Sequence, residues 1–175
     1  MIEPHYLGDV LSVTPPPEPE QLRHTMAQFA TGICVLTSRL DGRDCAMTAN
    51  SVTSVSLEPP LVLACIARGT RFQRSLTMSE HWAISVLDAT AEPVARQLAR
   101  SLPLEEQFQG VRAHRGNCTG LLLMDQALAT LECVTEAVYP GGDHLIYLGR
   151  VLSATSTYSE AGSLVYHASA YRTLP

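Results

Sequence analysis

The apolar residues near the start of the chain recur with the period of a helix. Their spacing of i, i+4, i+7 and i+8 places them on one helical face, at the positions Leu22, Met26, Phe29 and Ala30. Pro19 suits the first turn of such a helix, and Gly32 suits its end. The pattern therefore predicts an amphipathic helix over residues 18–30 that ends at Gly32.

The rest of the chain is dominated by short apolar and β-branched runs separated by turn residues, which predict strands. These runs occupy residues 32–38, 44–57, 61–67, 82–87, 127–139, 144–157 and 163–167, and the tail 170–173 closes the chain. Turn sequences at Leu40–Arg43 and Pro140–Asp143 join neighbouring runs as hairpins. Helical spacing returns only at 72–78 and 91–99, and the stretch 101–120 is expected to be a long irregular loop, of the kind that often carries function.

Many hairpin-linked strands with few short helices predict a mainly β fold, an antiparallel barrel with helices on its outside. A parallel sheet of the Rossmann type is disfavoured because no GxGxxG sequence follows a strand, and Gly141-Gly142 lies in a hairpin turn. The run Thr14-Pro-Pro-Pro17 is stiff and extended. We therefore expect residues 1–17 to form an arm and residues 18–175 to form one domain.

Composition removes several functions. All 12 basic residues are arginine, so the Schiff-base and P-loop chemistries of lysine are excluded. A net charge of −5 with scattered arginines argues against nucleic acid as a partner. No apolar run is long enough to span a bilayer, and residues 1–9 carry no basic residue of a signal peptide, so a cytoplasmic protein without a membrane partner is expected.

The 5 cysteines form no CxxC pair and lie mainly in apolar runs, which predicts buried reduced thiols rather than disulfides. No metal site is predicted, because the histidines show no HxH or HExxH spacing. The chain also lacks the GxSxG elbow of many hydrolases.

Two polar segments stand out from the apolar runs. Residues 48–56 (TANSVTSVS) are rich in short hydrogen-bonding side chains, and a continuous strand would turn Thr48, Asn50, Ser54 and Ser56 to one face. This segment is either a Ser/Thr-rich edge or a neutral surface that binds a flat heterocycle. The loop Arg68-Gly-Thr-Arg71 is either solvated or a phosphate site at the start of a helix.

His144 differs from the other histidines in its position. It follows Gly141-Gly-Asp143 at the head of a strand, where the turn would hold the imidazole beside an acid. It is either a solvent-exposed turn residue or a functional group.

Five segments, in order, resemble the small flavin reductases of two-component flavin-dependent monooxygenases, especially those of actinomycete natural-product pathways. They are LRHTMAQFATGICVLT (22–37), MTANSVTSVSLEPPLVLACIARGTR (47–71), HWAISVL (81–87), ATLECVTEAVYPGGDHLIYLGRV (129–151) and LVYHASAYR (164–172). The resemblance implies an FMN-binding split barrel, usually a homodimer, that oxidises NADH or NADPH and reduces FMN or FAD for a separate monooxygenase.

The resemblance also implies roles for individual residues. Those that would line the isoalloxazine and ribityl side are Thr48, Ala49, Asn50 and Ser51, with Ser54 close by. The strand end Cys65, Ile66 and Ala67 would present backbone to the flavin, and Arg68, Thr70 and Arg71 would meet its phosphate. His144, the candidate catalytic residue, and Tyr171 would meet the nicotinamide nucleotide.

Two positions depart from the family pattern. Phe72 stands where Ser or Thr is common, so either Thr70 and Arg71 supply the phosphate contacts alone or phosphate binding is weaker. Leu98 stands where Phe is common near the flavin.

Two other functions fit such a barrel, since a fold does not settle function. The protein could hold flavin tightly and act itself as an oxidase or oxygenase, or it could be a non-catalytic flavin or haem module. The sequence leaves the choices between FMN and FAD, and between NADH and NADPH, open.

Overall fold

The computed structural model describes residues 15–175. Most of the predicted arm, residues 1–14, lies outside the described residues. Residues 15–18 are exposed and have no regular secondary structure, and the first element begins at Pro19.

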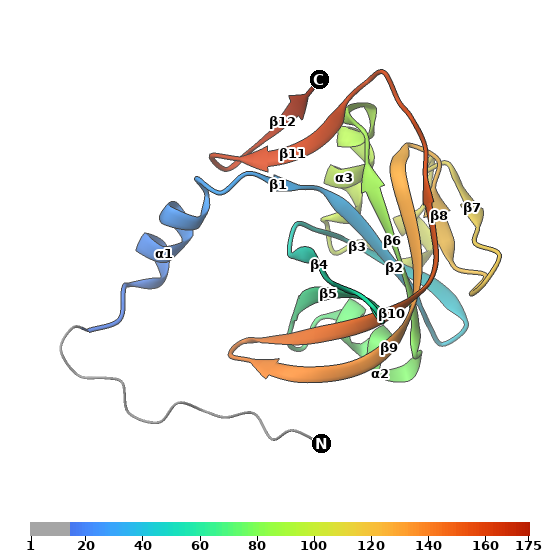
Figure 1. Ribbon diagram of the computed structural model, residues 1–175, viewed down its shortest axis with the longest axis horizontal. Helices are drawn as coiled ribbons and strands as arrows, with labels where there is room; N and C mark the ends of the chain where they lie inside the picture. The colour runs from blue at the N-terminus through green and yellow to red at the C-terminus, as the bar shows by residue number, and fades with distance from the viewer. Residues whose placement is uncertain (1–14) are drawn as a thin grey trace.

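Strands make up about half of residues 15–175 (Figure 1). They are β1 (Thr31–Gly32), β2 (Cys34–Leu40), β3 (Arg43–Ala49), β4 (Val52–Leu57), β5 (Pro60–Ala67), β6 (His81–Leu87), β7 (Ala113–Arg115), β8 (Leu122–Met124), β9 (Ala127–Gly141), β10 (His144–Ser156), β11 (Ser163–His167) and β12 (Ala170–Leu174). The helices are α1 (Pro19–Met26), α2 (Arg71–Met78), the short 3₁₀ turn η1 (Ala89–Ala91), α3 (Glu92–Leu98) and α4 (Leu104–Gln107).

Seven strands form one antiparallel sheet in the order β3-β2-β6-β9-β10-β5-β4, which curves into a partly open barrel (Figure 1). The strands β1, β11 and β12 form a second sheet, and β7 pairs with β8. The mainly β, antiparallel fold predicted from the sequence is confirmed. The long hairpin β9–β10 lies between β6 and β5 in this sheet, and His144, just after its turn, pairs with Ala67 of β5.

The core has two parts that share strand β2. One fills the barrel around Trp82, Leu36 and Ile66, and the other lies under α3 around Val35 and Leu98. Because successive side chains of a strand point to opposite faces, β2 can serve both parts, and its residues are buried on both sides. Leu98, one of the departures from the family pattern, is therefore a core residue with 2% of its surface exposed.

The N-terminal helix is shorter than predicted. It ends at Met26 and none of its residues is buried, and Gly32 belongs to β1 instead of ending the helix. The prediction over residues 18–30 is wrong at its end. No residue of the helix is buried, so packing against the described chain does not stabilise a further helical turn. Leu22, Met26 and Phe29 keep 52%, 55% and 66% of their surfaces exposed.

Three other segments differ from expectation. The run 44–57 is two strands, β3 and β4, that separate at Asn50 and Ser51. The stretch 101–120 contains α4 and β7, and the tail 170–173 is strand β12.

The cysteines are free thiols, as predicted, with Cys34, Cys45 and Cys133 buried. Within residues 15–175 no helix is both long and apolar enough to cross a membrane.

Candidate functional site

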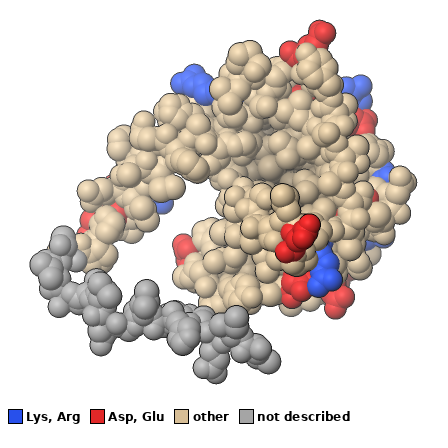
Figure 2. Space-filling view, viewed as in Figure 1, with Lys and Arg blue, Asp and Glu red and all other residues tan. Residues whose placement is uncertain are grey.

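Four neighbouring hollows surround the point where β3 ends. Two wide ones, of about 490 and 440 Å³, lie on either side of Phe29, and both include Asn50 and Ser51. A third, of about 220 Å³, joins Thr48, Ala49 and Asn50 to Tyr171. The fourth, also of about 220 Å³, lies between Thr48 and Arg71. Figure 2 shows the open hollow between α1 and the body of the molecule, with a surface almost free of charged side chains.

The segment between β3 and β4 brings neutral polar groups into these hollows. The Ser51 hydroxyl donates to the carbonyl of Cys65 at 2.8 Å, and the Cys65 N–H donates to the carbonyl of Ser51 at 3.1 Å. Asn50 is exposed, and its Nδ2 donates to the Thr31 hydroxyl at 3.1 Å. Since Asn50 keeps its amide oxygen free of any bond to described residues, it can hydrogen-bond a ligand.

Thr48 connects this strand to helix α3. Its hydroxyl donates to the carbonyl of Ala95 at 2.7 Å and keeps lone pairs that face the cavity. The neighbouring Ala49 is buried. This pairing fixes the distance between α3 and β3, so the small hollows on either side of Thr48 are built into the fold.

The predicted phosphate loop forms the corner between β5 and α2. The Thr70 hydroxyl accepts from the N–H of Gln73 at 3.1 Å and donates to the carbonyl of Ala67 at 2.9 Å, so it caps the helix. Arg68 is tied to the β9–β10 turn, where its Nε donates to the carbonyl of Gly142 at 2.9 Å. Arg71 lines a cavity of about 220 Å³ beside Thr48, and Arg68 lines none of the four hollows.

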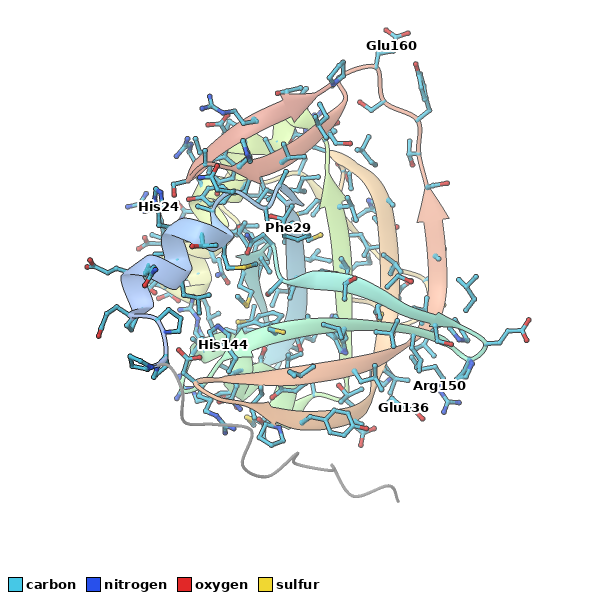
Figure 3. The ribbon with its side chains drawn as sticks, turned by 60° about the vertical axis from the view of Figure 1, so that its left-hand side comes forward. His24, Phe29, Glu136, His144, Arg150 and Glu160 are labelled. Atoms are coloured by element: carbon cyan, nitrogen blue, oxygen red, sulfur yellow. The ribbon has the colours of Figure 1, made fainter. Side chains whose placement is uncertain are left out.

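His144 begins β10 beside that corner. Its Nδ1 lies 2.7 Å from Oδ1 of Asp143, and this hydrogen bond lowers the pKa of the Asp143 carboxyl. The His144 side chain is 42% exposed and lies on the side of the barrel that faces α1 and Phe29 (Figure 3). None of the cavities described above includes it.

Tyr171 lies on β12, in the other sheet. Its ring stacks edge-on with Tyr166, with centroids 5.5 Å apart, and the Arg96 guanidinium lies 4.6 Å from its centroid. Burial raises the pKa of the Tyr171 phenol. His144 and Tyr171, predicted to meet the same nucleotide, thus lie on different sheets, and no described cavity contains both.

The structure gathers most of the predicted residues around these hollows and leaves Ser54, Ile66, Ala67, Arg68 and His144 outside their linings. Ser54 is exposed on the edge strand β4 and lines none of the cavities, because β3 and β4 are separate strands. The predicted alternation of residues 48, 50, 54 and 56 on one face is therefore wrong. The Ile66 side chain is fully buried in the core.

Sequence reasoning missed other residues that line the hollows. They are Thr31, Arg100, Ser101 and Gln107, together with Phe29, whose helical spacing suggested a core position. Only the arginine content of the region after α3 could have pointed to Arg100.

Comparisons with known proteins agree with this geometry. The model of the family described as flavin reductase like domain matches residues 26–175. The NADH-dependent FAD reductase of Streptomyces globisporus is 41% identical over 152 residues, which cover 85% of this chain and 82% of that protein. The reductase component of 4-hydroxyphenylacetate 3-monooxygenase from Thermus thermophilus is 34% identical and covers 89% of this chain and 96% of its own.

A solved structure gives the same result for the fold. The NADH:FAD oxidoreductase SgcE6 of Streptomyces globisporus C-1027 superposes with a TM-score of 0.85 at 36% identity, over 94% of this chain and 98% of that one. The predicted split barrel is confirmed.

Proposed function

The chain belongs to the flavin reductase-like family, and we propose that it oxidises NADH and reduces FAD or FMN for a separate monooxygenase. The observation that carries this proposal is the band of hollows around Asn50. Neutral hydrogen-bonding groups line its centre, and the arginine-lined cavity lies at one end.

The residues present fit a flavin nucleotide. An isoalloxazine edge offers carbonyl and ring-nitrogen groups that carry no full charge, and the Asn50 amide can pair with such groups. The phosphate end of the nucleotide is anionic, which suits Arg71. Asp and Glu are absent from the linings of these four hollows, so no carboxylate opposes the anion.

The nucleotides supply the chemistry: a hydride passes from the nicotinamide to the flavin, which also takes up a proton from water. The protein binds and orients the two rings. His144 lies beside Ala67 at the end of β5 and is held by Asp143, so it would position the nicotinamide carboxamide. Tyr171 would contact the nucleotide from the opposite wall of the Asn50 hollow.

A homodimer is part of the proposal. No residue of helix α1 is buried, and Leu22 and Met26 on its apolar face keep 52% and 55% of their surfaces exposed. The edge strand β4 is also open and carries no charge, with Val55 and Leu57 exposed. An exposed apolar helix face and an open sheet edge of this kind are normally covered in the native assembly. Sedimentation at micromolar concentration should give twice the chain mass, and Met26→Asp should give the monomer mass.

The direct test follows NADH and NADPH consumption with FMN, FAD and riboflavin in parallel. We expect turnover with NADH when FAD or FMN is supplied in excess, and a loss of catalytic efficiency of about tenfold or more in Asn50→Ala. Ser54→Ala is the matched control, because Ser54 is exposed and lines no described cavity. Absence of NADH oxidation with every flavin would exclude the reductase function and favour a binding module, and turnover of an organic substrate with flavin that survives dialysis would favour an oxidase.

A further inference from the structure

One cavity at the flavin site has walls from two regions far apart in the sequence. This cavity, of about 220 Å³, lies between the β5–α2 corner and the end of α3. Arg71 lines it from the first region, and Arg100 and Ser101 line it from the second. It adjoins the hollow that contains Asn50 and Tyr171, with which it shares Thr48 and Ala99.

The two arginines of this cavity are not held by carboxylates of the described chain. Five others form ion pairs with carboxylates, at Arg39, Arg43, Arg96, Arg115 and Arg150. Within residues 15–175 neither Arg71 nor Arg100 has a carboxylate within ion-pairing distance, and no acidic side chain lines the cavity. Two guanidinium groups without a carboxylate partner among the described residues, beside the hydroxyl of Ser101, favour an anionic ligand.

The wall that follows α3 is held by hydrogen bonds of two glutamines. The side-chain amide of Gln107, 1% exposed, accepts from the N–H of Ala46 at 3.0 Å and donates to the carbonyl of Ala46 at 2.7 Å. Gln97 on α3 donates to the carbonyl of Gln107 at 3.1 Å. These bonds fix the segment after α3 against β3, so Arg100 is attached to a pre-formed wall.

The position of Phe72 removes one source of phosphate contacts. Its ring is 3% exposed and packs in the barrel core, so no hydroxyl is available at this position. The hydroxyl of Thr70 is already used to cap α2. Arg68 points its Nε to the Gly142 carbonyl and does not line this cavity. The Arg100–Ser101 wall therefore adds a second cation to Arg71, together with a hydroxyl that makes no bond to described residues.

We propose that Arg100 is a specificity-determining residue that binds the flavin phosphate end together with Arg71, so that the enzyme selects FMN and FAD over riboflavin. The inference rests on the proposed function. It concerns equilibrium binding, however, so it can fail or hold separately from turnover.

The test titrates FMN, FAD and riboflavin by their fluorescence into wild type and Arg100→Gln. We expect the Kd for FMN and FAD to rise about tenfold or more, as for the loss of a charge-assisted hydrogen bond, and the Kd for riboflavin to stay within twofold. Arg112→Gln is the matched control, because Arg112 is exposed and lines none of the cavities described here. Equal weakening of all three flavins, or unchanged Kd for FMN and FAD, would overturn the proposal.

Two further measurements protect the test from misfolding of the variant. Arg100→Lys keeps the charge and should retain most of the affinity for FMN. Inorganic pyrophosphate added to wild type should compete with FMN but leave riboflavin binding unchanged, and competition with neither flavin would refute an anion site. Wild type that binds FMN in this way but never oxidises NADH would leave the phosphate site standing and remove the reductase function.

Discussion

A buried carboxylate on β9 offers a sharp test of what holds the fold. Glu132 is 3% exposed, and it accepts hydrogen bonds from the loop that links β7 to β8. The N–H of Thr119 donates to it at 2.6 Å, the Thr119 hydroxyl at 2.5 Å, and the N–H of Cys118 at 3.2 Å. We expect Glu132→Gln to destabilise the protein, because one carboxylate oxygen is replaced by an NH₂ group that faces these donors.

The size of the effect follows from the bonds that are lost. The substitution removes at least one hydrogen bond to a charged acceptor and leaves a buried donor without a partner, while the Thr119 hydroxyl can turn and accept from the new amide. Terms of this kind together give about 2 to 4 kcal/mol. With an ordinary urea slope, the midpoint should fall by about 1 to 2 M.

The same site predicts how stability depends on pH. Burial alone would raise the pKa of Glu132, but the hydrogen bonds from Thr119 and Cys118 outweigh it and lower the pKa below its usual value. A carboxyl whose pKa is lowered by folding stabilises the protein above the pKa of the unfolded chain, and this contribution disappears as pH falls through the folded value. The difference in stability between wild type and Glu132→Gln should therefore be full at pH 7 and shrink in acid.

Urea unfolding followed by the fluorescence of Trp82 measures both effects. Glu136→Gln on the same strand is the control, because Glu136 forms an exposed pair with Arg150 at 2.7 Å (Figure 3) and such pairs contribute little. A midpoint for Glu132→Gln equal to that of Glu136→Gln, or a difference that persists unchanged in acid, would refute the reasoning.

Other expectations follow from single contacts. Gly149→Ala should destabilise the protein by about 1 to 3 kcal/mol, measured by thermal unfolding, because a Cβ there would overlap Cζ2 of the buried Trp82. Gly116→Ala should lower the melting temperature as well, since its Cβ would meet the Glu132 carboxylate. Burial raises the pKa of Cys34 and of Cys133 to about 12, so iodoacetamide at pH 8 should label the exposed Cys118 in the native protein and spare both buried thiols, as mass spectrometry would show.

The strands could be predicted from the sequence because each carries its own signal. Alternating or continuous apolar runs end at turn residues such as Asp41 and Gly42, which adopt positive φ between β2 and β3. The division of 44–57 into β3 and β4 could not be found in this way. Asn50 and Ser51 are compatible with a strand, and the bonds that hold the chain in its bend join Ser51 to Cys65 and Asn50 to Thr31, both distant in sequence.

The same limit applies to helix α1. Its apolar residues do recur with helical spacing, and this spacing predicts that one face of the helix is covered. It does not predict which surface covers that face. The structure leaves Met26 and Phe29 exposed. In the proposed homodimer, the second copy would cover the apolar face that the sequence pattern assigned to the core. A residue such as Phe29 is then both a dimer residue and a wall of the cavities that contain Asn50.

This overlap connects assembly to the proposed reaction. If the partner copy covers α1, it must also approach the hollows on either side of Phe29, so bound flavin and the second copy would stabilise each other through the same surface. Sedimentation at dilute concentration should therefore show more dimer with FAD present than without it. If the shift depends on flavin bound near Asn50, Asn50→Ala should weaken it. Arg112→Gln should not, because Arg112 lines neither of these hollows. A monomer–dimer equilibrium indifferent to saturating FAD would separate the dimer surface from the flavin site.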